Sequence, residues 1–341
     1  MTRKSPITRQ FNWLWTPRFA LGIAVGLLAL YLAVKNVQWP AVGVALSKAD
    51  GFFLVLALGS VLLTTWAKAV RWRLLFYPRH SQLSMSNCIF VLLIGQLANN
   101  LLPARLGELV RAYFIAESNK ISKVFALATI VIEKALDSVM LLLLIALLSP
   151  WIPMPPWLRR SNLLISGVLV MLLLVVIIMA TQRKRIVRTL ESWIRRCPGL
   201  SLLRVFERLV EASEELHALR DFRVQVQLWA WSALIWILAV ATNALTFQAI
   251  DLDVVPLVSP LLLVVLMAGV ILPTSPIQLG VFHYLCVLTL SVFGVEQNVA
   301  LSYAILLHLV VYLPIVAGGV LGLWVENYEL GKLLTVSQGR D

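Results

Sequence analysis

Three charged side chains interrupt an apolar stretch, and their spacing is the sequence feature best suited to chemistry. Glu133, Lys134 and Asp137 lie inside the run ATIVIEKALDSVM. Glu133 and Asp137 are four positions apart, so a helix would place both carboxylates on one face. Two carboxylates on one face repel each other unless a cation, a proton or an arginine lies between them. We therefore expect them to pair with Arg105 or Arg111 from another element.

A second polar group surrounds a predicted helix break at Pro103. It comprises Asn99, Arg105, Glu108 and Arg111, and the last three follow one another at three-residue spacing. If the segment after the proline is helical, these three share a face. Arginines beside the free amides of a helix start suit an anionic phosphate. Residues that pair with one another at the membrane boundary would show the same spacing, and spacing alone does not separate the two interpretations.

A milder polar group lies in the second half of the chain, at Ser275, Gln278 and His283. We include these three among the substrate-binding candidates. Histidine titrates near neutral pH, so His283 is able to couple transport to protons. A single histidine in an apolar helix is more often a hydrogen-bonded packing residue, and burial keeps its ring neutral. We favour the packing interpretation.

The sequence carries no signature of a cofactor, metal or nucleotide site. Cys88, Cys197 and Cys286 are scattered without CxxC spacing, which argues against a disulfide framework or a zinc site. A nucleotide-binding fingerprint, a P-loop, a zinc spacing and a nucleophile elbow are all missing from the sequence. We expect no cofactor and no metal, and we expect that the protein is not an enzyme.

The elements that carry these residues are predicted membrane helices. Of the 341 residues, 60% are hydrophobic and 13% are charged, and the mean hydropathy is +0.86, which excludes an ordinary soluble fold. Apolar runs of about 20 residues are long enough to cross the hydrocarbon core of a bilayer. Six such spans are predicted, at residues 19–34, 52–67, 124–148, 163–181, 228–250 and 299–324.

The basic residues indicate how the chain is oriented. The net charge is +12, but the basic residues flank apolar spans and form no patch interleaved with aromatics, which excludes nucleic acid as a partner. The positive-inside rule places the densest basic segment, residues 183–223, in the cytoplasm. The N-terminus, residues 68–79, residues 105–123 and the C-terminal tail are also rich in Lys and Arg. We predict a multi-pass protein of the cell (inner) membrane with both termini cytoplasmic.

Two further apolar stretches, residues 88–103 and 261–293, fit this orientation only as re-entrant hairpins. The first is broken at Pro103 and Gly107, and the second at Pro273, Pro276 and Gly280, where a helix cannot continue. Non-helical backbone at membrane depth requires protein or water around it. The predicted fold class is an all-α polytopic membrane protein with six transmembrane helices plus two re-entrant broken-helix hairpins.

The two predicted hairpins resemble each other. LPARLGEL begins at residue 102 and LPTSPIQLGVF at residue 272. Such dipeptides are common in hydrophobic sequence, so chance is the alternative, but position and predicted topology agree and favour an inverted repeat. We predict a single membrane domain, 1–341, built from inverted halves 1–158 and 159–326. Residues 183–223 are predicted to form cytoplasmic amphipathic helices, and residues 327–341 a cytoplasmic tail.

Three motifs carry a resemblance to a known family. They are NNLLPARLGELVRAYF from Asn99, SKVFALATIVIEKALD from Ser122 and PTSPIQLGVFH from Pro273. Across nearly its whole length the chain resembles the transmembrane, flippase-like region of lysylphosphatidylglycerol synthases and its stand-alone relatives. By position, the resemblance implies functional weight on Asn99, Pro103, Arg105, Gly107, Glu108, Arg111, Glu133, Asp137, Pro273, Pro276 and Gly280.

The chain departs from the family pattern at five positions. Lys134 stands where arginine is usual, and Phe125 replaces an arginine. Ile277, Gln278 and His283 replace a glycine pair and a glutamate. The second hairpin is therefore expected to bind a different headgroup or to move differently.

The resemblance implies translocation of a polar-headgroup lipid. Bifunctional family members append a soluble aminoacyltransferase domain, which we expect this chain to lack because it ends soon after the last predicted span. Our main hypothesis is a polar cavity near the midplane, between the two hairpins, that holds the charged headgroup of a membrane lipid. The alternatives are a membrane-embedded lipid-modifying transferase and a scaffold that docks a cytoplasmic lipid-synthesising enzyme through residues 183–223. A homo-oligomer is a further candidate assembly.

Overall fold

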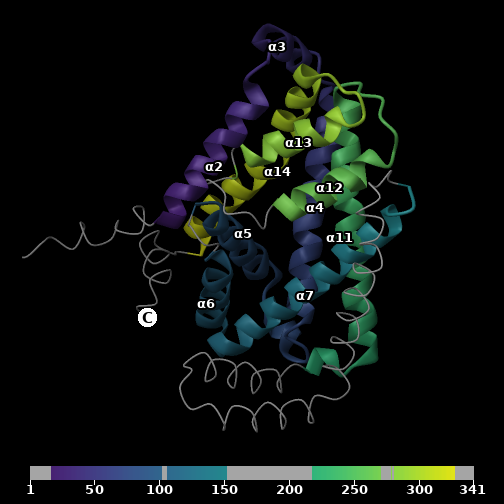
Figure 1. The fold of residues 1–341 in the computed structure, drawn as a ribbon. Helices are drawn as coiled ribbons and strands as arrows, with labels where there is room; N and C mark the ends of the chain where they lie inside the picture. The colour runs from purple at the N-terminus through teal and green to yellow at the C-terminus, as the bar shows by residue number, and fades with distance from the viewer. Residues whose placement is uncertain (1–16, 102–105, 152–216, 270–277, 279, 327–341) are drawn as a thin grey trace, which may run out of the picture. The chain divides into compact units, whose positions relative to one another are not determined.

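The computed structural model describes residues 17–101, 106–151, 217–269, 278 and 280–326 (Figure 1). Within these ranges the regular structure is helical and no strand occurs, which confirms the all-α class. The α-helices are α2 (Pro17–Val34), α3 (Trp39–Ser47), α4 (Gly51–Leu74), α5 (Met85–Leu101), α6 (Gly107–Asn119), α7 (Lys123–Leu148), α11 (Phe222–Ala249), α12 (Val258–Gly269), α13 (Val281–Ser291) and α14 (Gln297–Val325). Two short 3₁₀ helices, η2 (Arg79–Gln82) and η4 (His217–Leu219), precede α5 and α11.

Three of the described helices are long and apolar enough to cross a membrane. They are α4, α11 and α14, with 24, 28 and 29 residues, and at about 1.5 Å per residue each exceeds the roughly 30 Å of hydrocarbon. Helices α2 and α3 pass the same test only as a pair, and they are bent by 84°. Helix α7 has 26 residues, but Glu133, Lys134 and Asp137 interrupt its apolar sequence. The predicted span 163–181 lies outside the described residues.

Aspartate side chains begin two of the membrane-length helices. The Oδ1 atom of Asp50 accepts a hydrogen bond from the backbone N–H of Phe52 at 2.8 Å, at the start of α4. Asp221 accepts in the same way from the N–H of Arg223 at 2.8 Å, at the start of α11. Each carboxylate satisfies an amide that the first helical turn leaves unpaired. Local sequence therefore fixes where these two helices begin.

Both predicted helix breaks fall between described helices. Helix α5 ends at Leu101 and α6 begins at Gly107, while α12 ends at Gly269 and α13 begins at Val281. Helices α12 and α13 contact each other. They have 12 and 11 residues, which corresponds to lengths of about 18 and 16 Å. Neither is long enough to cross a bilayer by itself.

The chain divides into two compact units. Unit 1 comprises residues 1–62, 96–107 and 239–318, and unit 2 comprises residues 63–95, 108–238 and 319–341. The predicted inverted halves, 1–158 and 159–326, concern the internal symmetry of the chain. This division into units does not test that symmetry, so the halves stay a prediction. So do the cytoplasmic tail and the amphipathic helices, because residues 183–216 and 327–341 lie outside the described part of the chain.

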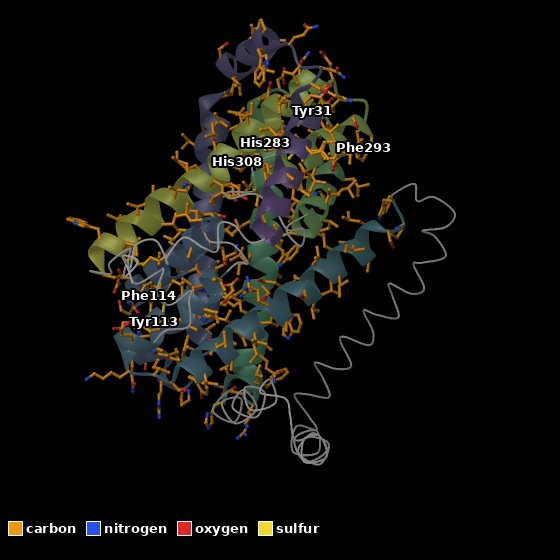
Figure 2. The ribbon with its side chains drawn as sticks, turned by 60° about the vertical axis from the view of Figure 1, so that its left-hand side comes forward. Tyr31, Tyr113, Phe114, His283, Phe293 and His308 are labelled. Atoms are coloured by element: carbon orange, nitrogen blue, oxygen red, sulfur yellow. The ribbon has the colours of Figure 1, made fainter. Side chains whose placement is uncertain are left out.

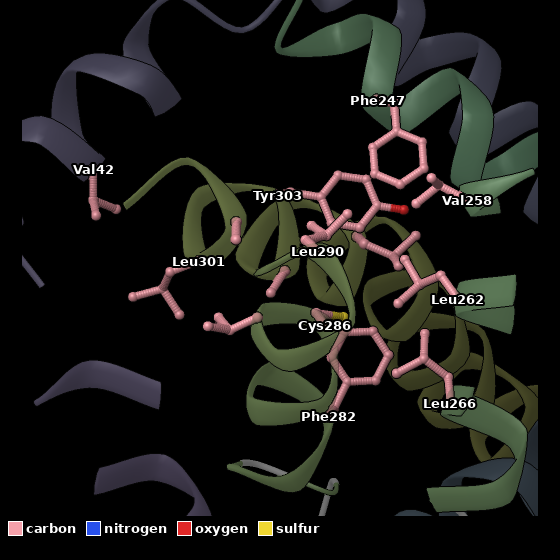
Figure 3. Close-up of a cluster of buried hydrophobic side chains, with 14 residues drawn as sticks. Val42, Phe247, Val258, Leu262, Leu266, Phe282, Cys286, Leu290, Leu301 and Tyr303 are labelled. Atoms are coloured by element: carbon pink, nitrogen blue, oxygen red, sulfur yellow. The ribbon is translucent and has the colours of Figure 1, made fainter. Parts of the chain in front are cut away.

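Unit 1 contains an apolar core built from α11, α12, α13 and α14, to which α3 adds Val42 (Figure 3). The rings of Phe247 and Tyr303 stack at a centroid distance of 4.2 Å. The buried hydroxyl of Tyr303 donates a hydrogen bond to the backbone carbonyl of Asn243 at 3.3 Å. Leu262 and Cys286 are fully buried in the same cluster. The short helices α12 and α13 are thus held by apolar packing within unit 1.

Gly280 allows α13 to begin against α2. Its backbone φ is +94°, a region that L side chains avoid. A Cβ atom at this position would clash with the backbone carbonyl oxygen of Gly26 on α2. Both the backbone conformation and the close approach therefore require glycine here, which explains the break predicted at this residue.

A polar cluster in unit 2 joins the ends of helices α5, α6 and α14. The side-chain amide of Asn87 donates to Glu326 Oε2 at 2.8 Å. Its Oδ1 atom accepts from Ser118 Oγ at 3.1 Å and from Asn119 Nδ2 at 3.0 Å. Ser118 and Asn119 form the last turn of α6. The cluster fixes the end of the helix that carries Glu108 and Arg111.

Candidate functional site

Four charged side chains from three helices of unit 2 form an ion-pair network, in which three side chains are buried and Asp137 is partly exposed. Glu133 on α7 makes a two-point contact with Arg111 on α6, with Nη2–Oε2 at 2.8 Å and Nη1–Oε1 at 3.3 Å. The pairing of Glu133 with Arg111 was one of the two expected from the sequence, and it is confirmed. Both side chains are 4% exposed or less. A two-point guanidinium–carboxylate contact fixes orientation as well as charge.

Asp137 pairs with Arg71, a residue that the sequence analysis assigned to a basic membrane flank. Arg71 Nη1 donates to Asp137 Oδ1 at 2.7 Å and to Ser232 Oγ on α11 at 3.0 Å. Its Nη2 lies 3.7 Å from Glu133 Oε1. The Arg71 side chain is fully buried, so its role as a plain orientation signal is corrected. Glu133 therefore lies between two guanidinium groups.

Trp72 holds the Arg111 guanidinium from its other face. The guanidinium carbon lies 4.2 Å from the centroid of the Trp72 ring, a geometry in which the ring quadrupole attracts the cation. The indole N–H of Trp72 donates to Thr129 Oγ1 on α7 at 3.1 Å. Arg111 is thus clamped between a carboxylate and an aromatic face, and its position is defined before any ligand arrives.

An outer layer of charges is partly accessible. Glu108 on α6 pairs with Lys134 Nζ at 2.9 Å and lies 3.6 Å from Arg111. The side chains of Glu108, Asp137 and Lys134 are 26, 29 and 54% exposed. Lys68, one turn before Arg71 on α4, interacts electrostatically with Asp137 and Glu133. The site therefore has a buried layer, in which the ion pairs hold the charged groups in place, and an outer layer that a polar ligand can reach.

Several hydrogen-bonding groups of the arginines are unused. The Nε and Nη2 atoms of Arg71 and the Nε atom of Arg111 are buried and have no hydrogen-bond partner among the described residues. A buried donor without a partner costs about 1–3 kcal/mol. The network therefore keeps donors available that water or an anionic group would satisfy.

Asn99 closes the first helix break. Its Oδ1 atom accepts the backbone N–H of Gly107 at 2.8 Å. The sequence analysis expected the free amides at the start of α6 to face a phosphate, and this amide is already bonded inside the chain. Asn99 is thus a helix cap for α6, and its predicted substrate contact stays a prediction.

The remaining predicted site residues do not join this network in the described part of the chain. Pro103, Arg105, Pro273, Ser275 and Pro276 lie outside the described residues. Gln278 has a left-handed backbone with φ of +57°, and His283 is buried in unit 1. The structure thus brings together Glu108, Arg111, Glu133 and Asp137, and it adds Arg71 and Trp72, which sequence reasoning missed.

Comparison with known proteins identifies the family. Residues 19–319 match the model of the lysylphosphatidylglycerol synthase TM region. The chain belongs to this family. A UPF0104 membrane protein of Methanothermobacter thermautotrophicus is 24% identical over 317 residues, which cover 88% of this chain and 93% of the relative. A UPF0104 membrane protein of Methanocaldococcus jannaschii is 23% identical over 293 residues, which cover 82% of this chain and 86% of the relative.

Two departures from the family pattern have a physical explanation in the structure. Lys134, where the family usually has arginine, keeps an ion pair with Glu108 at 2.9 Å. Phe125, which replaces an arginine, is 6% exposed and packs edge-on against Phe76 at a centroid distance of 5.7 Å. The first change preserves the charge, and the second exchanges a charge for apolar packing. Position 125 of this family member is therefore part of the apolar packing beside the charged network.

Proposed function

We propose that this family member translocates a polar-headgroup lipid between the leaflets of the cell membrane. The observation that supports the proposal is the two-layer charge network of unit 2. Ionised groups within membrane helices are costly and mark pathways for polar or charged substrates. A buried ion pair adds little stability compared with apolar packing. Function is therefore the better reason for the chain to keep this network.

The outer layer is the proposed contact for the headgroup. Asp137 and Glu108 are the accessible carboxylates, and each is held by a cation that a headgroup can replace or share. Arg111, with Arg105, is the proposed phosphate contact, and Glu133 balances the charge of Arg111 and Arg71 when no headgroup is bound. Exchanging one ion partner for another avoids leaving a bare charge in a low-dielectric site, which would cost about 3–5 kcal/mol.

The proposed pathway combines six membrane spans with two re-entrant hairpins in inverted halves. Its support is the shortness of α12 and α13, their contact with each other and the two helix breaks. Transporters place their binding sites at broken helices of this kind. On the predicted orientation both termini are cytoplasmic and the end of α4 that carries Arg71 faces the cytoplasm. We therefore assign headgroup capture to the inner leaflet.

The test is lipid exchange in liposomes that contain the purified full chain. The probes are phosphatidylglycerol and phosphatidylethanolamine carrying a fluorescent acyl chain, and dithionite quenching of the outer leaflet measures exchange. We expect Glu133→Gln to abolish protein-dependent exchange, and Asp253→Asn, an exposed carboxylate outside the network, to retain it. Asp137→Asn, at a partly exposed position, is expected to reduce exchange in a protein that still folds, with a moderate loss of stability. No exchange above protein-free liposomes with either probe, or full exchange by Glu133→Gln, overturns the proposal.

We also propose that the lipid leaves chemically unchanged, so that the chain is not an enzyme. Its support is that Glu108, Glu133 and Asp137 are each held in an ion pair, which makes a carboxylate a poorer general base. The competing function is a membrane-embedded transferase that uses these carboxylates. Lipid mass spectrometry of a deletion strain separates the two, because loss of a transporter redistributes a lipid between leaflets and loss of a transferase removes its product. A missing lipid species overturns the transport proposal.

A scaffold for a lipid-synthesising enzyme is a second competitor, with residues 183–223 as its docking segment. Deletion of the part of this segment that precedes η4, residues 183–216, is expected to leave liposome exchange intact, because the charge network lies on α4, α6 and α7 and the start of α11 is kept. Loss of a co-purifying enzyme in the same variant would assign the segment a docking role of its own. The homo-oligomer stays a prediction, which the mass of the purified protein in detergent measures.

A further inference from the structure

A stack of three rings crosses between two helices of unit 1. His283 lies on α13, and His308 and Tyr312 lie on α14, with His283 and His308 adjacent in Figure 2. The centroids of the two imidazoles are 5.0 Å apart, at an interplanar angle of 24°. His308 and Tyr312 stack at 4.1 Å and 6°. Phe282 meets His308 edge-on at 5.1 Å. The ring of His308 is therefore enclosed by aromatic neighbours.

Both imidazoles are buried, and one nitrogen of each ring lacks a hydrogen-bond partner among the described residues. His283 and His308 are 7 and 8% exposed. The Nδ1 atom of each is buried and has no hydrogen-bond partner among the described residues. An unpaired buried polar group costs about 1–3 kcal/mol, and two apolar side chains would fill this space without that cost. The burial of His283 agrees with the packing interpretation favoured from the sequence, whereas its hydrogen bonding stays a prediction.

The described helices around the two imidazoles contain no counter-ion for a charged ring. The described parts of the helices at this site, α2, α12, α13 and α14, contain no Asp, Glu, Lys or Arg between residues 24–34, 258–269, 281–291 and 297–325. Their other titratable side chains are Tyr31, Tyr284, Cys286, Tyr303 and Tyr312. All five are neutral at ordinary pH. Within the described part of the chain, a proton that binds here is thus stabilised by aromatic faces or by water that enters.

We infer that His283 and His308 form a site that binds a single proton and couples it to the separation of α13 from α14. His308 takes the proton, because the face of Tyr312 is a favourable neighbour for a cation. His283 lies in the first turn of α13, where the helix dipole opposes positive charge. A second proton would place two like charges about 5 Å apart in an apolar core, which repulsion forbids.

The sign of the coupling follows from linkage. A buried imidazolium without a counter-ion is less stable than one in contact with water, so the separated form of α13 and α14 binds the proton more tightly than the stacked form. Lowering the pH therefore shifts unit 1 toward the separated form. The use of this shift in lipid movement rests on the proposed function, whereas the proton site itself does not.

The first test observes each histidine directly. The chain has four histidines, so ring-labelled full-length protein in lipid nanodiscs gives four signals, assigned by single His→Gln substitutions. We expect His308 to become an imidazolium on acidification from pH 8.5 to 4, and His283 to respond at the same midpoint while staying neutral. A His308 that stays neutral across this range, or two imidazolium signals from the pair, overturns the inference.

The second test measures the movement of α13. Cys286 is fully buried on α13, and with Cys88→Ser and Cys197→Ser it is the only thiol left. Its rate of modification by a membrane-permeant thiol reagent, divided by the rate of free cysteine at the same pH, is expected to rise several-fold on acidification. This rise should disappear in His308→Gln and persist in the control His217→Gln. A flat rate in the parent protein, or a rise that survives His308→Gln, overturns the coupling to α13.

A third measurement separates the proton site from transport. Liposome exchange is recorded at pH 5 and 8 for the parent chain and for His308→Gln. Exchange that depends on pH only when His308 is present supports proton-coupled translocation. Exchange with the same pH dependence in both proteins overturns the coupling to transport. Absence of exchange in every protein overturns the proposed function, and the first two tests then decide the proton site.

Discussion

The most direct prediction concerns Arg71, because an orientation signal and a buried ion-pair partner predict different effects of its replacement. If Arg71 is only an orientation signal, its replacement leaves folding unchanged. The structure instead has it fully buried, with Asp137 at 2.7 Å, Ser232 at 3.0 Å and Glu133 at 3.7 Å. Removing one partner of a buried ion pair costs about 3–5 kcal/mol. We expect Arg71→Gln to lower the free energy of unfolding by that amount, because it leaves a carboxylate of the network short of a cation.

Asp137→Asn is expected to cost less than Arg71→Gln. Asp137 is 29% exposed, its amide replacement still accepts a hydrogen bond from Arg71, and Arg71 keeps Glu133 as a second partner. We estimate a loss of about 1–3 kcal/mol, the range for hydrogen bonds to charged groups. The double variant should lose less than the sum of the single variants, by at least about 1 kcal/mol, because the two residues interact directly.

The assay is equilibrium unfolding of the purified protein in mixed micelles by increasing detergent denaturant, followed by tryptophan fluorescence. Arg79→Gln is the matched control, since Arg79 lies in the same basic stretch and is exposed. We expect it to leave the unfolding midpoint unchanged. Equal midpoints for Arg71→Gln and Arg79→Gln, or strictly additive losses in the double variant, would refute the buried-network reasoning.

Three further outcomes follow from the packing and charges described above. Gly280→Ala should destabilise unit 1 by more than Gly294→Ala, since both glycines have positive φ but only the first is crowded. The backbone strain alone is about 1–2 kcal/mol for each variant. Thermal unfolding compares the midpoints of the two variants. Trp72→Phe, which keeps an aromatic face and removes the indole N–H, should cost about 0.5–1.5 kcal/mol, and Trp72→Leu clearly more; micelle unfolding again decides. Lys134→Arg should retain liposome exchange, whereas Lys134→Glu should lose it because it opposes Glu108; equal exchange by both variants would contradict this.

Much of the charged site could be predicted from the sequence, because it depends on charged residues that lie close together along the chain. Glu133 and Asp137 are one helical turn apart in an apolar run, so their need for cations was evident, and Arg111 was correctly expected as a partner. Arg71 was missed because its position near the end of a span is also where orientation signals lie. Its burial depends on the packing of α4 against α7 and α11, which no spacing rule contains.

The helix breaks were predictable for a similar reason. Proline and glycine favour helix ends, so an end near Leu101 and a start after Gly280 followed from residue type, although Pro314 lies within α14. The capping role of Asn99 and the approach of Gly280 to Gly26 were not predictable, because each joins residues that are separated along the chain. His308 was overlooked entirely, although its spacing of four from Tyr312 within an apolar run was a usable signal.

The hydrogen bond between Asn99 and Gly107 holds the end of α5 and the start of α6 together independently of the residues between them. A side chain on the preceding helix ties down the first amide of the next one, so the chain between them is closed into a short ring. Residues inside that ring can be exchanged without moving the points at which α5 stops and α6 starts. Grafting this segment from a relative is therefore a way to test the proposed headgroup contact of Arg105 while α5 and α6 keep their ends.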